Sequence, residues 1–585
     1  MKWLDPEIYL SDNYVVLDWE TTNYDKGDAK NRSNRIVLGS YGRWREGEWQ
    51  VYSIYAGEYD QEEVIRACEE AEFIVAQNAK FELGWLERAG LDIGEVLVWD
   101  TMIGQYVLNG NKRKSLDLNS IAKEYGIGTK NNLVSILIKG GICPSDIPKE
   151  WLIKYCEKDV DLTHEVFLRQ RDKIKEKGLL PCMFTRCIFT PVITDMEFRG
   201  MYLDAERVHS RLEEAKIALA KVEQELEKIV PGVNWGSPPQ KAHALYGELG
   251  FSELRDRKGN FIRNKKSKQF PDGAPLTDKD TVLALKATTR KQRQLQEVFA
   301  EQSRLSKQIT TYLTKFEEAC DNNGGHIYGK FNQTVTQTHR LSSSGPNFQN
   351  FDRTLKPVFT SRHEGWSIGE IDEAQLEFRV AAFLGSDIEA RKDIIEGFDV
   401  HSFSASIIGC SRQEAKAHTF KPLFGGTSGT KKEKKYYEAF REKYRAITDT
   451  QDNWVKEALD TKEQTIASGL VFYWPYLRVT GSGYVEGNTN VRNYPIQSLA
   501  TADIVPVAVA YLWHDMRKHK MQSFLVNTIH DSAIAEVHPD ERELFEELAV
   551  KAFTVSVIDY LRIVYNIEFN VPLEADIKYG EHWGE

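Results

Sequence analysis

The sequence lacks the cysteine pattern of a disulfide framework or a zinc site. Its 585 residues include seven cysteines, an odd number, and no two of them form a Cys-x-x-Cys pair. We therefore expect free thiols in a reducing compartment.

Long apolar runs are also missing. No run reaches the ~18 residues that a helix needs to span a bilayer. The longest candidate, residues 504–513, predicts a buried helix instead. The first seven residues contain no apolar signal core. These features predict a cytoplasmic protein without a membrane partner.

Positive charge is scarce overall, with a net charge of −11, which argues against a simple basic nucleic-acid binder. The charge is uneven, however. Residues 255–293 contain twelve Lys or Arg against four Asp or Glu. This basic segment is either a solvated loop or a contact for duplex phosphates.

The composition that is present, 41% hydrophobic and 28% charged, is typical of a globular chain, and the length predicts about three to five domains. Apolar runs predict strands at 14–18, 36–42, 49–55 and 73–77, followed by a helix from Ala79, which together indicate an α/β unit up to about residue 180. Helical spacing predicts helices at 206–229 and 279–318, separated by a basic loop at 254–275.

Two aspartates stand where strands end. Residues 368–380 read as a strand that delivers Asp372 and then a helix, and residues 524–537 read as a strand, a turn with Asp531 and a second strand. Two such carboxylates can bind two divalent ions ~3.5–4 Å apart for phosphoryl transfer. A strand-end aspartate alone is more often a turn or cap residue.

A possible nucleotide-binding helix lies between them. Arg412, Lys416, Phe420 and Phe424 recur every four residues and are predicted to share one helical face. Cations followed by aromatics suit a triphosphate and a base, although a solvated charge pair beside a core aromatic pair is the alternative. Pro422 predicts that the helix bends or ends near Phe420.

A second group of acids precedes the first in the chain. Asp18 and Glu20 alternate on a predicted strand and so face one side, and Glu82 follows another strand. Tyr155 and Asp159 are one helical turn apart. Four acids and a tyrosine suit two-metal hydrolysis of a phosphodiester, with Tyr155 orienting the water.

Taken in order, these segments resemble family A DNA polymerases, the group of DNA polymerase I and its phage replicative relatives. Residues 338–350 and 492–497 are similar to primer-template contact segments of that family, and residues 234–240 and 304–312 to its thumb. The resemblance implies an α/β and α+β multidomain fold, in which a ribonuclease H-like 3′–5′ exonuclease domain precedes a right-hand polymerase domain. The implied ranges are exonuclease 1–180, thumb 181–329, palm 330–385, fingers 386–468 and palm again 469–585.

The resemblance also implies residue roles. Two Mg²⁺ ions at each active site, replaceable by Mn²⁺, would be bound by Asp372, Asp531, Asp18, Glu20, Glu82 and Asp159. Lys416 would protonate pyrophosphate, and Glu377 would reject ribonucleotides by crowding the 2′ position. The incoming nucleotide would be bound by Arg412, Lys416, Phe420, Phe424, Glu377, Gln375 and His530. DNA would be bound by Arg340, Asn347, Gln349, Asn350, Arg379, Asn493, Gln497, Arg304 and Lys307.

Several positions depart from the family pattern. Glu82 stands where Asp is expected, and we expect exonuclease activity to persist because the charge is kept; a degenerate, structural domain is the alternative. Ser532 stands where many relatives have Glu, and Phe424 where Tyr is usual. Arg492 is a candidate to replace the Arg that relatives carry at Thr489. Asp161 competes with Asp159 as a ligand, but only Asp159 has the spacing to Tyr155.

The function predicted is a monomeric, template-directed DNA polymerase with 3′–5′ proofreading. Its partners would be primer-template DNA and dNTPs, with a helicase, a primase or a single-strand-binding protein as further candidates. The exonuclease segment begins near residue 1, which leaves no 5′-nuclease segment and favours replication of a phage genome in host cytoplasm. The alternatives are a lone exonuclease, a single-subunit RNA polymerase and a non-catalytic primer-template binder. Asp372, Asp531, Arg412 and Lys416 argue against a lone exonuclease. Glu377 and the fused proofreading segment argue against an RNA polymerase, and a non-catalytic binder would not need both Asp372 and Asp531.

Overall fold

The computed structural model describes residues 2–56, 61–129, 132–256, 259–267, 270–350, 352–481 and 483–585. The chain forms two compact units. Unit 1 comprises Met1–Gly200, Tyr328–Gln349 and His363–Glu581, and unit 2 comprises Met201–Ile327, Asn350–Arg362 and His582–Glu585.

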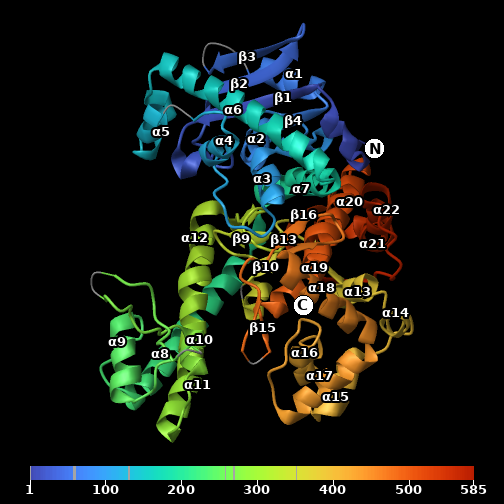
Figure 1. Ribbon diagram of the computed structural model, residues 1–585. Helices are drawn as coiled ribbons and strands as arrows, with labels where there is room; N and C mark the ends of the chain where they lie inside the picture. The colour runs from blue at the N-terminus through green and yellow to red at the C-terminus, as the bar shows by residue number, and fades with distance from the viewer. Residues whose placement is uncertain are drawn as a thin grey trace. The chain divides into compact units, whose positions relative to one another are not determined.

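The N-terminal part of unit 1 is built on a five-stranded mixed sheet with the order β3-β2-β1-β4-β5 (Figure 1). The central strand β1 is antiparallel to β2 and parallel to β4. Its first four residues are buried, whereas Asp18 and Glu20 are half-buried. The strands are β1 (Tyr14–Thr21), β2 (Ile36–Arg45), β3 (Glu48–Tyr55), β4 (Phe73–Ala76) and β5 (Val98–Asp100), which confirms the four predicted strands.

Helices surround this sheet. The longest, α6 (Lys149–Glu176), packs against β1, β2 and β3, so that its residues lie above the polar end of β1. The others are α1 (Glu62–Glu70), α2 (Ala79–Arg88), α3 (Thr101–Asn109), α4 (Leu118–Tyr125) and α5 (Asn132–Lys139). The start of α2 confirms the helix predicted from Ala79.

Helix α7 (Leu180–Arg199) joins this sheet to the rest of unit 1. Every residue from Cys182 to Glu197 is buried, because α7 packs against α2 and α3 on one side and against α20 (Val505–Lys518) on another. One continuous apolar core runs through these elements. Unit 1 is therefore not two separate globules.

Among the described residues, the stretch Asn488–Lys518 passes the length and hydropathy test for a membrane span, but its apolar window is 94% buried inside the protein. It consists of α19 (Asn488–Ser498), a π-helical turn (Leu499–Ile504) and α20. The buried helix predicted at residues 504–513 is confirmed.

The second sheet of unit 1 is antiparallel, with the order β16-β17-β11-β18. Its strands are β11 (Ser367–Glu373), β16 (Phe524–Ile529), β17 (Ser532–Val537) and β18 (Ala575–Gly580). Helix α13 (Leu376–Leu384) follows β11 directly, as predicted. The short strands are β8 (Lys330–Asn332), β9 (Ser342–Ser344), β12 (Glu463–Thr465), β13 (Val471–Tyr473), β14 (Arg478–Val479) and β15 (Val485–Glu486).

A helical group lies between β11 and β16 in the chain. Helix α15 (Val400–Ile408) packs against α16 (Arg412–Thr419) and α17 (Lys431–Lys443). The remaining helices of unit 1 are α14 (Ile388–Ile395), α18 (Arg445–Thr461), α21 (Arg542–Lys551) and α22 (Val557–Tyr565).

Unit 2 combines long helices with the small sheet β10-β6-β7. Helix α8 (Ala205–Ile229) confirms the helix predicted at 206–229 and packs along α11 (Arg290–Lys307). The single helix predicted at 279–318 is wrong, because Thr289 and Gln292 form a capping box that starts α11 anew. The other elements are β6 (Met201–Leu203), α9 (Pro238–Ala242), α10 (Lys279–Ala284), α12 (Thr314–Asn323), β7 (His326–Ile327) and β10 (Phe359–Thr360).

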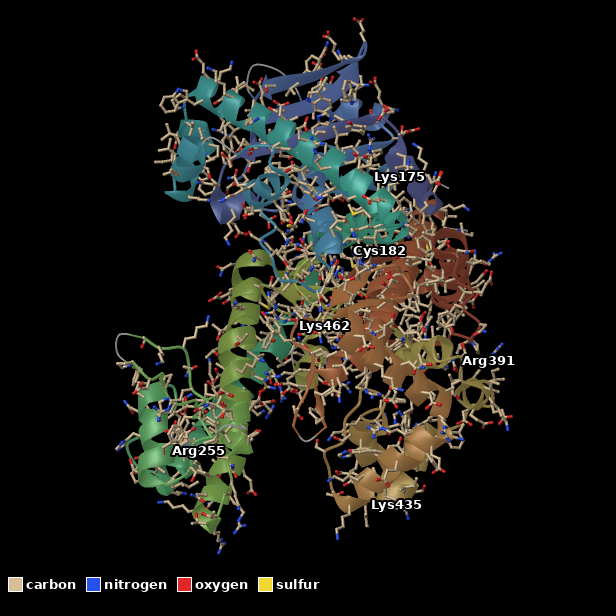
Figure 2. The ribbon with its side chains drawn as sticks, in the orientation of Figure 1. Lys175, Cys182, Arg255, Arg391, Lys435 and Lys462 are labelled. Atoms are coloured by element: carbon tan, nitrogen blue, oxygen red, sulfur yellow. The ribbon has the colours of Figure 1, made fainter. Side chains whose placement is uncertain are left out.

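The seven cysteines are free thiols, as predicted. Cys182, labelled in Figure 2, lies fully buried in the core, in the first turn of α7. Cys156 is fully buried as well, but it stands among acids, a setting described below.

Candidate active sites

Asp372 and Asp531 lie on adjacent strands at one end of the antiparallel sheet. Asp372 is opposite Ser532, and the Glu373 N–H donates to the carbonyl oxygen of Asp531 at 3.1 Å. His530 has φ +57°, a left-handed conformation that makes the turn between β16 and β17 tight. The hairpin therefore holds Asp531 beside the end of β11, where Asp372 is exposed.

Negative charge gathers at this end of the sheet. Burial raises the pKa of Asp531, with Glu377 and Glu370 raising it further and Arg340 lowering it. Glu373 is buried, and neither of its carboxylate oxygens has a hydrogen-bond partner among the described residues. Clustered carboxylates of this kind need cations, and oxygen donors are the ligands that Mg²⁺ prefers. The residues present fit a divalent-metal site.

Four of the predicted nucleotide- and DNA-binding side chains surround Asp531. An Arg340 N–H donates to Nδ1 of His530. Glu377 is hydrogen-bonded to Gln497 of α19, and burial raises the pKa of the Glu377 carboxyl. The structure thus brings together residues that lie far apart in the sequence.

Helix α16 is short. The Ser411 hydroxyl accepts from the N–H of Glu414 and the Glu414 side chain accepts from the N–H of Ser411, which starts the helix. The helix ends at Thr419, with Phe420 as its C-cap, so the end that Pro422 predicted near Phe420 is confirmed.

The prediction that Arg412, Lys416, Phe420 and Phe424 share one helical face is wrong for the two phenylalanines. Phe420 and Phe424 follow the last helical residue, so only Arg412 and Lys416 lie on one helical face. Phe420 instead packs against Phe378 of α13, with ring centroids 5.5 Å apart. This contact places Phe420 beside the helix that carries Glu377.

The two cations of α16 lie at the surface. The Arg412 Nε donates to Asp399 at 2.7 Å, which lowers the pKa of that carboxyl. Lys416 is exposed. His401 lies close enough to both cations that, after burial, their charges lower the pKa of its imidazole. Positive charge is therefore available on this face for an anionic ligand.

The second group of acids meets over the five-stranded sheet. Asp18 and Glu20 of β1 and Glu82 of α2 interact electrostatically, and burial followed by these two charges raises the pKa of Glu82 well above its usual range. Glu82 is 4% exposed, and its Oε2 has no hydrogen-bond partner among the described residues. Asp159 is also buried, on α6, one turn after half-buried Tyr155. These residues fit divalent metal ions as well.

Neighbouring acids have other tasks. Asp161 accepts from the indole N–H of Trp49 at 3.1 Å, which leaves Asp159 as the better ligand candidate. Asp100 caps α3 and accepts from the N–H groups of Asn78 and Ala79 at 3.0 and 2.8 Å. Asp100 therefore fixes the start of α2 and, with it, the position of Glu82.

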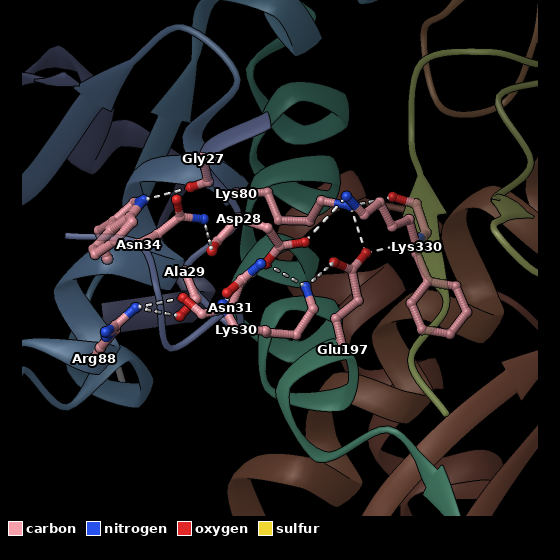
Figure 3. A network of polar contacts seen from close by, with 12 residues as sticks. Gly27, Asp28, Ala29, Lys30, Asn31, Asn34, Lys80, Arg88, Glu197 and Lys330 are labelled. Carbon is pink, nitrogen blue, oxygen red and sulfur yellow. Dashed lines mark hydrogen bonds and ion pairs between the residues drawn. The ribbon is translucent and has the colours of Figure 1, made fainter. Parts of the chain in front are cut away.

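A charged network ties α2 to the rest of unit 1 (Figure 3). Lys80 of α2 donates to Glu197 Oε1 of α7 at 2.5 Å and to the carbonyl oxygen of Phe331 on β8. Glu197 Oε1 also accepts from the Phe331 N–H at 2.6 Å. Asp28 pairs with Lys30 and with Lys330, each at 3.0 Å. The helix that carries Glu82 is thus anchored on β8.

Two protein-family models match this chain. A model of DNA polymerase family A matches residues 205–585, and a model of the 3′–5′ exonuclease matches residues 7–175. The chain belongs to DNA polymerase family A. It is a DNA-directed DNA polymerase with an N-terminal 3′–5′ exonuclease domain, and proteins of this kind use divalent metals.

The polymerase has distant relatives among characterised proteins. It is 25% identical over 97% of its length to DNA polymerase I of Aquifex aeolicus, of which it covers 96%. Against DNA polymerase I of Bacillus subtilis it is 23% identical over 83% of its length, but it spans only 55% of that protein. The solved POL domain of Pol1 from M. smegmatis, in complex with DNA primer-template and dNTP, shares its fold, with a TM-score of 0.75, 18% identity and coverage of 99% and 97% of the two chains.

The segment of the polymerase expected to contact primer-template is internally bonded. Asn347 Oδ1 accepts from the Ser343 hydroxyl at 2.9 Å and from the Gln349 N–H at 3.0 Å. The Gln349 side chain donates to the Thr528 carbonyl oxygen of β16 at 3.3 Å. Asn493 lies on α19 one turn before Gln497. The segment is thereby positioned on the catalytic sheet, and its DNA contacts stay predictions.

Two arginines with predicted roles, Arg379 and Arg492, form hydrogen bonds or ion pairs within the protein. Arg379 is 5% exposed and donates to the carbonyl oxygens of Ala374 and Pro572 and to the carboxylate of Glu574. This arrangement speaks against the predicted DNA contact, because the guanidinium is used to join α13 to the segment before β18. Arg492, the candidate replacement at the family's Arg position, forms an ion pair with Asp452.

Three predicted DNA contacts of the polymerase belong to unit 2. Arg304 pairs with Glu301 at 2.6 Å and with Asp352 at 3.0 Å, while Lys307 and Asn350 are exposed.

The basic segment 255–293 contains an irregular loop, α10 and the start of α11. Its residues 257–258 and 268–269 lie outside the described residues. The domain boundaries predicted above stay predictions.

The sequence reasoning missed two residues of the exonuclease domain. Lys80 lies two residues before Glu82, and only its ion pair with Glu197 of α7 reveals its role. The thiol of Cys156 lies within 4.8 Å of carboxylate oxygens of Asp18 and Glu20. Its position directly after Tyr155 was the signal that could have found it.

Proposed function

We propose that this chain extends a DNA primer from dNTPs on a template strand by two-metal phosphoryl transfer at Asp372 and Asp531. The observation that carries the proposal is the pairing of these strand ends inside a family A polymerase fold. The related Pol1 domain of known structure was solved with DNA primer-template and dNTP, which supports the same ligands here.

The metal assigned to this site is Mg²⁺. Two bound Mg²⁺ ions would stabilise the attacking 3′ oxygen and the leaving pyrophosphate oxygen. Asp372 and Asp531 would hold them, and burial raises the pKa of the neighbouring Glu373, with the charges of Asp531 and Asp372 raising it further.

The remaining side chains bind and select the nucleotide. Arg412 and Lys416 are exposed cations for the triphosphate, with Lys416 donating a proton to the leaving pyrophosphate. Phe420 would pack on the sugar and base. Glu377, held by Gln497, would fill the space of a ribose 2′-hydroxyl and so reject ribonucleotides.

The exonuclease domain is proposed to proofread. Asp18, Glu20, Glu82 and Asp159 would bind its metal ions, and Tyr155 would orient the attacking water. The support is that Asp18, Glu20 and Glu82 interact electrostatically and that buried Glu82 carries an oxygen without a hydrogen-bond partner among the described residues. Glu82 lies close enough to Asp18 and Glu20 for their charges to raise its pKa.

A replicative role fits an enzyme that joins synthesis and proofreading in one chain. We propose that it acts as a monomer in the cytoplasm, with a helicase, a primase or a single-strand-binding protein as partners. Replication of a phage genome stays a prediction.

One experiment tests the main proposal. A labelled primer-template is incubated with Mg²⁺ alone, with dNTPs or with rNTPs. We expect shortening without nucleotides, extension with dNTPs and little extension with rNTPs. Absence of dNTP-dependent extension would contradict the polymerase proposal, and absence of shortening would contradict proofreading.

A further inference from the structure

The exonuclease acid Asp18 stands at the end of a polar row that crosses three strands. Asp18 on β1 is directly opposite Ser40 on β2, and Ser40 is directly opposite Ser53 on β3. Residues directly opposite each other in adjacent strands point to the same face of a sheet. The three side chains therefore form a line on one face, beneath helix α6.

Two residues of helix α6, Cys156 and Glu157, contact the two ends of this row, Asp18 and Ser53. The Cys156 thiol donates to Asp18 Oδ2 at 3.1 Å and lies 3.5 Å from the Asp18 carbonyl oxygen. The Ser40 hydroxyl is hydrogen-bonded to the same thiol, and its oxygen lies 2.7 Å from that of Ser53. Ser53 in turn donates to Glu157 at 3.1 Å. Both Cys156 and Ser40 are fully buried.

We propose that Cys156 is a positioning residue of the exonuclease site, whose thiol holds the Asp18 carboxylate in the orientation that binds a metal ion. The inference rests on the proposed exonuclease function. One oxygen of Asp18 is engaged by the thiol, and the carboxylate is thereby fixed against repulsion from Glu20 and Glu82. The Ser40 hydroxyl, which is hydrogen-bonded to the thiol, fixes the thiol in turn.

The size of the effect follows from the chemistry of the donor. Removing a hydrogen-bond partner of a metal ligand typically weakens metal binding 10–100-fold. A thiol is a weak donor. We therefore expect Cys156→Ala to raise the Mg²⁺ concentration for half-maximal primer shortening roughly tenfold, with a nearly unchanged rate at saturating Mg²⁺.

The matched control is Cys156→Ser, which keeps a donor of similar size and should stay within about twofold of the parent. A purely space-filling role instead predicts similar losses in the alanine and serine variants, because neither side chain fills the volume of the sulfur atom in the cluster with Leu152 and Val37. Primer extension by the same preparations reports that the fold is intact.

A direct readout is Mn²⁺ binding, measured by calorimetry in an Asp372→Asn background that weakens the polymerase site. Cys156→Ala should lower the affinity of the remaining exonuclease sites roughly tenfold, and Cys156→Ser should not. Equal Mg²⁺ dependence and equal Mn²⁺ affinity in parent and alanine variant would overturn the inference, as would an equal loss in both variants. If the parent never shortens primers, the proofreading proposal fails, and the Mn²⁺ titration still decides the role of Cys156.

Discussion

A strand-end aspartate usually caps a turn, so Asp372 and Asp531 are informative because of the charges around them. Glu377 and Glu370 raise the pKa of Asp531 and Arg340 lowers it, while burial beside the two aspartates raises the pKa of Glu373 well above its usual range. A protein gains nothing in stability from such a concentration of carboxylates unless cations join it. At the residue scale, electrostatics identifies the site better than spacing does.

The two active sites use separate acids, which gives the first prediction. Asp372→Asn and Asp531→Asn should each slow extension at least ~1000-fold, equivalent to about 4 kcal/mol of transition-state stabilisation. Primer shortening without nucleotides should persist in both variants. Gel assays of extension and shortening on one labelled primer-template measure both quantities.

Asp540→Asn is the control, because this exposed aspartate lies in the turn after β17 and away from the strand ends. It should leave both activities within about twofold of the parent. Joint loss of extension and shortening in the Asp372 variant would contradict the independence of the sites.

At the scale of the element, α16 depends on its first turn. Ser411→Ala removes the capping hydroxyl and should destabilise this eight-residue helix by about 1 kcal/mol. Because α16 carries Arg412 and Lys416, its fraying should raise the KM for dNTPs several-fold with little change in Tm. Steady-state kinetics and hydrogen exchange over residues 412–419 measure the two effects.

Ser428→Ala serves as the comparison, since this exposed serine lies in the loop between α16 and α17 and caps neither. A KM shift of equal size in both variants would show that the helix cap is not the cause.

The network between α2, α7 and β8 gives a stability prediction. Glu197→Gln keeps an acceptor for the Phe331 N–H but removes the charge that faces Lys80. A mostly buried ammonium group then lacks its counter-charge, and we expect a loss of about 2 kcal/mol of unfolding free energy. Denaturant titration measures it, and the double variant with Lys80→Met should be less destabilised than the sum of the single variants.

The exposed pair between Glu486 and Arg478 is the matched control. Glu486→Gln should cost less than about 0.5 kcal/mol, because solvent screens that pair. Similar losses of unfolding free energy in the two variants would mean that burial of the Glu197 pair does not strengthen its contribution to stability.

Elements with a clear apolar period were predictable, and interrupted ones were not. The strands at 14–21, 36–45 and 48–55 and the helix at 205–229 follow directly from their patterns. The helix predicted at 279–318 failed because the capping box at Thr289 is a local signal that the longer apolar period concealed.

In the active sites too, local features were predictable from the sequence and tertiary contacts were not. Pro422 foretold the end of α16, yet the packing of Phe420 on Phe378 depends on a contact 42 positions away in the chain. The burial of Arg379 and the thiol contact at Asp18 likewise arise from tertiary packing, which spacing cannot express.

At the scale of the whole molecule, the net charge of −11 coexists with a local excess of positive charge in residues 255–293. Lys265 and Lys266 are exposed within the basic segment of unit 2. If they contact duplex phosphates, Lys265→Gln together with Lys266→Gln should weaken primer-template binding and lower the slope of log K against log salt by up to about 2. Titrations at several salt concentrations measure the slope.

Lys216→Gln is the control in the same unit, because Lys216 already pairs with Glu213. An unchanged slope in the double variant would assign the basic segment to solvent rather than to DNA.

The buried helix α7 has a practical consequence for anyone engineering this enzyme. Starting a shortened gene at residue 201 would delete a helix whose sixteen consecutive residues from Cys182 to Glu197 are all buried, and it would expose the side of α20 that packs against α7. An editing-free version is therefore better made by single substitutions among the exonuclease acids than by truncation.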